Sequence, residues 1–380
     1  MRGAEAVLAC LREQGVDTLF GYPGGMILPL YDALYAQDEI RQILVTHEQN
    51  AAHAADGYAR ATGRVGVCIA TSGPGATNLV TGLATAYMDS IPMVAITGQV
   101  DIAMLGRDAF QETDILDVTM PITKHNYKIK NAADLVPTIR QAFALARSGR
   151  QGPVLLDVPR NLFFEEVAYT PAEPEVRPPG KPDADFMICA AEAAAEIAAA
   201  ERPLVIVGGG VISAGTSAEI TSFIEKYHLP VVHTLMGMGA VPSTHPQMLG
   251  FAGMHGEKAA NYAIGAADLV IAVGSRFADR QTGNLSKYTE NRKFIHIDID
   301  PAEIDKNIKN SLGLAGDMRT ILKLLMRQAP KGDLSAWWEQ IRAWQEEHDY
   351  DYHVGRLTVP WALHQVAQST TGKAYAYVTD

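Results

Sequence analysis

Three segments of this chain place glycine or ionisable residues directly after short apolar runs, an arrangement typical of ligand-binding loops. Phe20–Gly25 is rich in glycine, His47 and Glu48 follow the next apolar run, and Thr71–Asn78 combines glycine, proline and small polar residues. In open α/β sheets, ligands collect at the carboxyl ends of the strands. These segments are therefore candidate binding loops.

Glu48 is a candidate acid. Apolar surroundings at the end of a buried strand favour the protonated form of a carboxyl group, which can then donate a proton. The alternative interpretation is that Glu48 begins a helix and interacts with the positive end of the helix dipole. The local pattern leaves both interpretations open.

The glycine-rich segments allow tight turns and a close approach of the backbone to a ligand. In Thr71–Asn78, the free N–H groups of a helix N-terminus would also face the ligand. This segment is not a P-loop, because no Gly-Lys-Ser/Thr follows it. An ordinary strand-to-helix turn with a cap explains both segments equally well.

Two further segments resemble parts of nucleotide sites. Gly208–Gly210 follows an apolar run, but its spacing departs from the Gly-x-Gly-x-x-Gly pattern of dinucleotide-binding turns. His296–Asp300 ends another run, where a carboxylate either binds a ribose or adenine edge or caps the next helix. The histidines show neither HExxH nor paired Cys/His spacing, so we assign no metal ligand in this chain.

Short apolar runs alternate with amphipathic stretches, which predicts βαβ units and mainly parallel sheets. Continuous apolar runs are typical of parallel strands, because such strands are buried on both faces. The predicted fold class is therefore α/β with two doubly wound domains, the second of them Rossmann-like. The predicted strands are Leu19–Tyr22, Ile43–Thr46, Val65–Thr71, Met93–Thr97, Val154–Val158, Pro203–Val207, Pro230–Thr234, Asp268–Val273 and Lys293–Ile299, and the predicted helices include 51–61, 76–88 and 186–200.

The predicted organisation is a first domain over residues 1–168, a linker over 169–186, a middle domain over 187–330 and a final segment over 331–380. Five prolines within residues 170–185 stiffen the linker and exclude regular helix or sheet there. In the final segment, Trp337, Trp338 and Trp344 recur at helical spacing and predict a helix that docks on another surface. A second helix over 361–368 and a strand-like run over 374–379 suggest the opening of a third α/β domain.

The composition excludes several classes of protein. With a net charge of −11 and no long basic run, the chain lacks the clustered Lys and Arg of a nucleic-acid surface. No apolar run approaches the roughly 20 residues that span a membrane, and no signal peptide is recognisable. Cys10, Cys68 and Cys189 are scattered without CxxC spacing, so the reducing cytoplasm is the expected location.

Taken together, these motifs resemble in order and spacing the catalytic subunit of acetolactate synthase (acetohydroxyacid synthase), a thiamine-diphosphate-dependent family. The resemblance covers nearly all of the chain. In the first domain it rests on Gly21–Gly25, Thr46–Gln49, Ala70–Asn78, Asp89–Pro92, Ile96–Gln99, Asp108–Glu112, Thr123–Asn126 and Gly152–Val154. In the middle domain, which resembles the family's FAD-holding domain, it rests on Leu235–Gly239, Gly253–Gly256, Ser275–Arg280 and His296–Glu303.

The resemblance implies a role for individual residues. Glu48 corresponds to the glutamate that hydrogen-bonds N1′ of the thiamine aminopyrimidine and exchanges a proton with it. Arg280 corresponds to an arginine that recognises the carboxylate of the second 2-keto acid. Residues implied to line the reaction site are Gly25, Phe110 and Gln111. Residues implied to contact thiamine diphosphate are Tyr22, Pro23, Gly24, Glu48 and Ser90. Residues implied to contact a structural FAD are Arg150, Gly209, Thr234, Leu235, Met254, His255, Gly274, Arg276, Asp298 and Asp317.

The implied reaction decarboxylates pyruvate and transfers the hydroxyethyl unit to a second 2-keto acid, pyruvate or 2-ketobutyrate, in branched-chain amino acid synthesis. The family forms homodimers or homotetramers, and a regulatory small subunit is a possible partner. It holds diphosphate and Mg²⁺ in a third domain through a Gly-Asp-Gly motif. Because no Gly-Asp-Gly occurs here, the chain is expected to be truncated and, alone, inactive or nearly so.

Two alternative functions remain. A related thiamine-dependent enzyme, such as pyruvate oxidase or oxalyl-CoA decarboxylase, would share Glu48 and the glycine turns, although Arg280 and the segment around His255 favour acetolactate synthase. A non-catalytic FAD-binding fragment would explain the missing motif of the third domain. Arg160 and Asp101 depart from the residues common at these positions in the family, a difference that bears on substrate access and inhibitor sensitivity.

Overall fold

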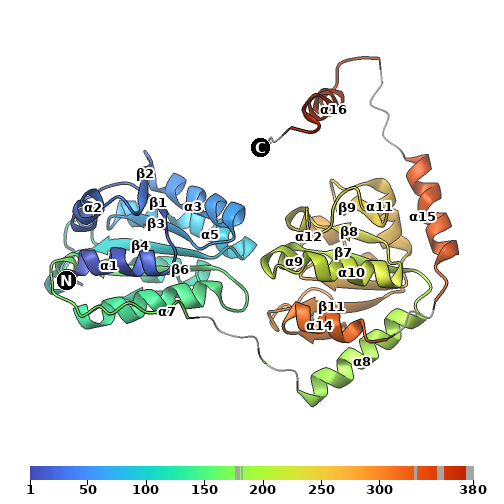
Figure 1. Ribbon diagram of the computed structural model, residues 1–380, viewed down its shortest axis with the longest axis horizontal. Helices are drawn as coiled ribbons and strands as arrows, with labels where there is room; N and C mark the ends of the chain where they lie inside the picture. The colour runs from blue at the N-terminus through green and yellow to red at the C-terminus, as the bar shows by residue number, and fades with distance from the viewer. Residues whose placement is uncertain (176–179, 181–182, 329–331, 349–354, 374–380) are drawn as a thin grey trace.

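The computed structural model describes residues 1–175, 180, 183–328, 332–348 and 355–373 (Figure 1). Its named strands form two six-stranded sheets, in the orders β2-β1-β3-β4-β6-β5 and β12-β11-β10-β7-β8-β9. The paired strands in both sheets run parallel. This architecture confirms the predicted α/β fold with two doubly wound, parallel-sheet domains.

The first sheet is covered by helices on both faces. Its strands are β1 (Thr18–Gly21), β2 (Arg41–Leu44), β3 (Gly66–Ala70), β4 (Met93–Gln99), β5 (His125–Lys128) and β6 (Pro153–Pro159). Its helices are α1 (Gly3–Glu13), α2 (Leu28–Tyr35), α3 (Glu48–Thr62), α4 (Pro74–Thr77), α5 (Val80–Asp89), α6 (Ile115–Thr119) and α7 (Leu135–Arg147). Helices α1, α2 and α7 pack on one face and α3, α4 and α5 on the other. Strands β3, β4 and β6 are therefore buried along their whole length.

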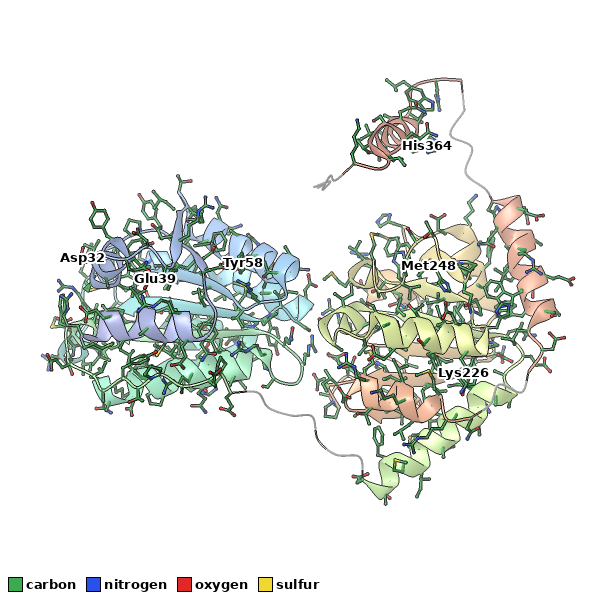
Figure 2. All side chains as sticks on the ribbon, in the orientation of Figure 1. Asp32, Glu39, Tyr58, Lys226, Met248 and His364 are labelled. Atoms are coloured by element: carbon green, nitrogen blue, oxygen red, sulfur yellow. The ribbon has the colours of Figure 1, made fainter. Side chains whose placement is uncertain are left out.

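The second sheet carries one continuous apolar core. Figure 2 shows the side chains of this domain, with Met248 of β9 and Lys226 of α10 labelled. Its strands are β7 (Pro203–Val207), β8 (Val231–His233), β9 (Met248–Phe251), β10 (Leu269–Val273), β11 (Lys293–Asp298) and β12 (Leu312–Ala315). Its helices are α8 (Ala184–Ala199), α9 (Gly209–Ser213), α10 (Ser217–Tyr227), α11 (Lys258–Ala266), α12 (Asp279–Thr282), α13 (Leu285–Tyr288) and α14 (Met318–Leu325).

The tryptophan-rich helix α15 (Ser335–Glu347) packs against this second core. The indole Nε1 of Trp337 donates to the carbonyl oxygen of Pro203 at 3.0 Å, and that of Trp338 donates to the carbonyl oxygen of His228 at 2.9 Å. The second core therefore continues beyond residue 330, where the sequence places the end of the middle domain. The last described helix, α16 (Val359–Thr370), contains no buried residue.

Three strands were not predicted from the sequence. Strand β5 has the polar sequence His-Asn-Tyr-Lys, and β9 and β12 are short and interrupted by glycine. These edge segments lack the continuous apolar run that marks a central parallel strand, so their pairing depends on the neighbouring strand. The predicted strand over 374–379 lies outside the described residues.

Other predicted boundaries were also displaced. Strand β2 ends at Leu44, before the predicted end at Thr46, and α3 begins at Glu48 rather than at residue 51. The predicted helix over 76–88 is divided into α4 and α5. Helix α8 begins at Ala184, inside the predicted linker, because the Asp183 side chain accepts a hydrogen bond from the N–H of Phe186 at 2.8 Å and caps the helix.

No helix in the described part of the chain has the length and the apolar character needed to cross a membrane.

Candidate functional site

Glu48 is the first residue of α3, and its side chain is only 8% exposed. His47 caps the helix, because its Nδ1 accepts the backbone N–H of Gln49 at 3.1 Å. The Oε2 atom of Glu48 accepts a hydrogen bond from Nδ2 of Asn78 at 2.9 Å. Glu48 therefore begins a helix, and its carboxyl group is also buried and held by the loop after β3. The two interpretations from the sequence, a helix N-terminal glutamate and a buried carboxyl group, both describe its position.

The two glycine-rich loops meet at Thr71. The N–H of Met26 donates to Oγ1 of Thr71 at 3.2 Å. A Cβ atom on Gly24 would lie 2.5 Å from Cγ2 of Thr71, and a Cβ atom on Gly75 would lie 2.8 Å from the same methyl group. Only glycine allows this close approach at both positions. The structure thus brings Tyr22–Gly25 and Thr71–Asn78 together beside Glu48.

Gly75 lies against the second oxygen of Glu48. A Cβ atom there would lie 3.1 Å from Oε1 of Glu48, so a side chain at this position would crowd that oxygen. In the same loop, Oγ of Ser72 is buried and has no hydrogen-bond partner in the part of the chain that the structure describes. A buried carboxyl oxygen and an unpaired hydroxyl group fit a ligand that carries ring nitrogens, such as an aminopyrimidine.

Phe110 and Gln111 lie next to this group. The backbone of Gln111 has a φ of 58° and packs against Gly73, where a Cβ atom would lie 2.6 Å from the Gln111 carbonyl oxygen. Phe110 is 80% exposed, and Tyr22 and Gly25 are also exposed. We call Glu48 and the two loops beside it, Tyr22–Gly25 and Thr71–Asn78, the Glu48 group. The exposed residues Tyr22, Gly25 and Phe110 form its solvent-accessible rim.

A second site lies between the two sheets. A cavity of about 650 Å³ is lined by both domains, a volume in the range of small-molecule and cofactor sites. All the residues that the resemblance assigns to FAD line this cavity, namely Arg150, Gly209, Thr234, Leu235, Met254, His255, Gly274, Arg276, Asp298 and Asp317.

Backbone packing builds one wall of this cavity. A Cβ atom on Gly208 would overlap the carbonyl oxygen of Gly274, so the loops after β7 and β10 cross with their backbones in contact. Asp298 ends β11, and burial raises the pKa of its carboxyl group. Asp317 caps α14 by accepting the N–H of Thr320 at 2.8 Å. Carboxylates at strand ends beside a glycine turn fit the ribose part of a dinucleotide.

Glu303 belongs to this wall and was not singled out from the sequence. It is 4% exposed, and its Oε1 accepts Nη1 of Arg150 at 2.6 Å and Nζ of Lys306 at 2.8 Å. Its Oε2 is buried and has no hydrogen-bond partner among the described residues. The sequence gives only a weak indication of Glu303, namely its position soon after the carboxylates at the end of β11. Nothing in the sequence indicates that Glu303 pairs with Arg150 of the other domain.

Two residues that the resemblance assigns to the cofactor or substrate site line the interdomain cavity. Ser90 is expected to contact thiamine diphosphate, but it lines the interdomain cavity, where its Oγ accepts Nε of Arg150 at 2.8 Å. Arg280 also lines this cavity, in the second domain, whereas Glu48 lies in the first. The Arg280 side chain is 76% exposed and forms an ion pair of 3.9 Å with Asp279. The structure thus does not join Arg280 to the Glu48 group.

Asn78 and Thr71 are further residues to which the sequence assigned no individual role. Both lie inside the predicted loop 71–78, so the motif located them. Among the described residues, no group of three or more His, Cys, Asp or Glu side chains is arranged to hold a metal ion.

Comparison with known proteins gives two family matches. Residues 1–118 match the thiamine pyrophosphate enzyme N-terminal TPP binding domain, and residues 190–325 match the thiamine pyrophosphate enzyme central domain. The matched regions contain the Glu48 group and the second-domain wall of the interdomain cavity, respectively.

Curated relatives extend over both regions. The acetolactate synthase large subunit of Haemophilus influenzae is 42% identical over 99% of this chain and 67% of its own length. That of Parasynechococcus marenigrum is 48% identical over 94% of this chain and 58% of its own length. The probable acetolactate synthase large subunit of Methanocaldococcus jannaschii is 47% identical over 95% of this chain. The chain thus spans about 58–60% of the length of the last two relatives.

Proposed function

Because the chain belongs to the family of acetolactate synthase large subunits, which are thiamine-pyrophosphate enzymes, we propose that it forms part of a transferase that makes acetolactate. In the proposed reaction, pyruvate loses CO₂ and its hydroxyethyl unit is joined to pyruvate or 2-ketobutyrate. The single observation that carries the proposal is Glu48, a buried carboxyl group at the meeting point of the two glycine loops.

Glu48 is proposed to bind and release a proton at a ring nitrogen of the aminopyrimidine. Thiamine diphosphate, when bound, supplies a carbon nucleophile, which protein side chains lack. Asn78 holds Oε2 of Glu48, so Oε1 is the oxygen available for proton transfer. The backbone of Tyr22–Gly24 is proposed to contact the cofactor. Any contact of Ser90 with the cofactor would come from the wall of the interdomain cavity, where Ser90 lies.

We assign the interdomain cavity to FAD with a structural role. The guanidinium groups of Arg150 and Arg276 suit a diphosphate, because a planar donor binds two oxygens at once. The Asp298 carboxylate suits a ribose hydroxyl. These assignments are supported by the placement of all the family-implied FAD residues around one cavity.

The remaining assignments concern substrate and partners. Gly25, Phe110 and Gln111 are proposed to line the space in which the 2-keto acids react, and the exposed Arg280 to bind the carboxylate of the second one. Because Arg280 and Glu48 lie in different domains, we propose that subunit assembly, as a homodimer or homotetramer, completes the site. We also propose that Mg²⁺ binds with the diphosphate, and we assign no residue of this chain to it. A regulatory small subunit is the proposed partner, and the cytoplasm is the proposed location.

Replacing Glu48 by glutamine tests the function. The measurement is acetolactate formation from pyruvate by the protein that contains these 380 residues, supplied with thiamine diphosphate, Mg²⁺ and FAD. Glu48→Gln is expected to lower turnover by about 100-fold or more, because the amide cannot exchange the proton. Glu39→Gln, which changes an exposed glutamate in the same domain, is the matched control and should retain wild-type turnover.

Two outcomes would contradict the proposal. Near-normal turnover in Glu48→Gln would remove Glu48 from proton transfer. Acetate in place of acetolactate as the product of wild-type protein would favour a related thiamine-dependent oxidase.

A further inference from the structure

The carboxyl-terminal end of α5 is a point of charged contact between the domains. Asp89 is the last residue of α5, and Ser90 follows with a left-handed φ of 61°. Arg276 of the second domain donates from Nη1 to the carbonyl oxygen of Met88 at 2.7 Å, and its Nη2 lies 3.9 Å from Oδ1 of Asp89. A cation at this end of a helix is favourable, because the helix dipole is negative there.

The other oxygen of Asp89 faces helix α3. Nη2 of Arg60 donates to Oδ2 of Asp89 at 2.8 Å. The same guanidinium group binds both oxygens of Asp56, through Nε at 2.7 Å and through Nη2 at 3.2 Å. Asp56 and Arg60 belong to α3 and lie about two and three turns after Glu48. Asp89 thus connects the helix that presents Glu48 to an arginine of the second domain.

These four side chains form a balanced cluster of two carboxylates and two guanidinium groups. Asp56 is buried, and the side chains of Arg60 and Asp89 are mostly covered. Burial alone would lower the pKa of Arg60, but its hydrogen bonds to Asp56 and Asp89 raise this pKa above its ordinary value. Arg60 therefore stays charged, and its planar group fixes both carboxylates in orientation.

Two members of the cluster, Asp89 and Arg276, line the interdomain cavity. Met88, Asp89, Ser90 and Arg276 all line it, as does Met236, whose Sδ lies 3.7 Å from Nη1 of Arg60. A ligand in this cavity would therefore lie beside Asp89, which binds Arg60 of α3.

We propose that Asp89 is a positioning residue that couples occupancy of the interdomain cavity to the order of α3, and so to the placement of Glu48. The proposal rests on the assignment of FAD to this cavity. A bound flavin restricts the movements of Arg276 and of the end of α5. Asp89 then keeps its hydrogen bond to Arg60, and the carboxyl-terminal half of α3 opens less often. Because such coupling is reciprocal, a ligand that orders α3 at Glu48 also favours flavin binding.

Hydrogen–deuterium exchange of the 380-residue chain, stripped of flavin and then saturated with FAD, tests this coupling. In the wild type, FAD is expected to slow exchange of amides 208–211 at the cavity and, by about fivefold or more, of amides 56–62 in α3. Asp89→Asn keeps the shape of the side chain and removes its charge. In this variant, FAD should still protect amides 208–211 but should no longer protect amides 56–62.

Arg64→Gln is the matched control, because it breaks an exposed ion pair with Asp17 just beyond the end of α3. This variant should show the full wild-type response in α3.

The possible results separate this proposal from the flavin assignment. If FAD protects amides 208–211 but leaves 56–62 unchanged in the wild type, the coupling is overturned and the flavin assignment stands. Unaltered protection of 56–62 in Asp89→Asn also overturns it. If FAD protects no amides at all, the flavin assignment fails, and the coupling fails with it. Should Asp89→Asn not fold, as judged by circular dichroism, the wild-type comparison alone decides.

Discussion

At the scale of single residues, the candidate site depends on how one carboxyl group is held. Asn78 anchors Oε2 of Glu48, and the absence of a side chain on Gly75 avoids crowding at Oε1. A carboxyl group fixed through one oxygen presents the other in a defined direction, which a proton-transfer group requires. The residue that orients Glu48 is therefore as specific a feature of the site as Glu48 itself.

Asn78→Ala is expected to destabilise the fold, because it leaves a buried carboxyl oxygen without a donor. The expected loss in the free energy of unfolding is about 1–3 kcal/mol, measured by urea denaturation. Asn131→Ala is the control, since the Asn131 amide donates at 2.9 Å to Asp134 on the exposed surface. Equal losses in the two variants would show that the anchor of Glu48 contributes no more than a surface hydrogen bond.

At the scale of elements, the ends of neighbouring strands place polar groups next to each other in the core. Asp157 of β6 is fully buried beside β4. Its carboxylate accepts Oγ1 of Thr97 at 2.7 Å and Nε2 of Gln99 at 3.0 Å. Burial raises the pKa of Asp157 to about 6 from its ordinary 3.8, and the two hydrogen bonds only partly oppose this rise.

This shift predicts a pH dependence of stability. An aspartate with a raised pKa binds its proton more tightly in the folded state, so its contribution is full below about pH 3.8 and is lost as pH rises through about 6. Between these values the wild type should lose about 3 kcal/mol relative to Asp157→Asn, in which no charge develops. Urea denaturation of both proteins at pH 4 and pH 7 measures the difference.

The amide group introduced by Asp157→Asn can be accommodated, because its oxygen can accept a hydrogen bond from Gln99 while its nitrogen donates to the hydroxyl of Thr97. Asp38→Asn, at an exposed position, is the control and should follow the wild-type profile. If the free energy of unfolding changes with pH in the same way in the wild type and in Asp157→Asn, Asp157 is not the source of the pH dependence.

At the scale of the whole molecule, charged contacts join the two α/β domains around the interdomain cavity. Arg150 of the first domain pairs with the buried Glu303 of the second at 2.6 Å, and Arg276 of the second binds the end of α5 in the first. A ligand in this cavity would bridge both domains. The proposed flavin would therefore be placed to stabilise the domain arrangement.

Arg150→Gln is expected to separate the unfolding of the two domains. All the tryptophans lie at or beyond residue 337, and those of α15 pack on the second core, so their fluorescence reports the second domain. Circular dichroism reports both domains. We expect coincident urea midpoints in the wild type and midpoints about 1 M apart in the variant, because the buried Glu303 loses its partner from the first domain.

Lys293→Gln provides the control, since Lys293 pairs with Glu196 inside the second domain. It should shift the fluorescence midpoint without separating the domains. Coincident midpoints in Arg150→Gln would show that the ion pair does not couple the domains.

Much of the fold and the position of the candidate site follow from the sequence by itself. The central strand Pro203–Val207 was predicted to the residue, and the other central strands to within one or two residues, because a parallel strand buried on both faces needs a continuous apolar run. The predicted ends of the strands also identified Glu48 and the glycine-rich loops as candidates, because ligands bind at the carboxyl ends of parallel strands. The spacing of these motifs was specific enough to indicate the family.

Only the tertiary structure decided which distant residues meet. Strand β5 is polar, and β9 and β12 are short and interrupted by glycine, so these strands depend on backbone pairing with a neighbouring strand. Ser90 lies with Arg150 on the cavity wall, and Arg280 lies in a different domain from Glu48. Arg150 and Glu303 are 153 positions apart. Pairings of this kind depend on how two separately folded sheets dock, and local propensity and hydrophobic periodicity carry no information about that docking.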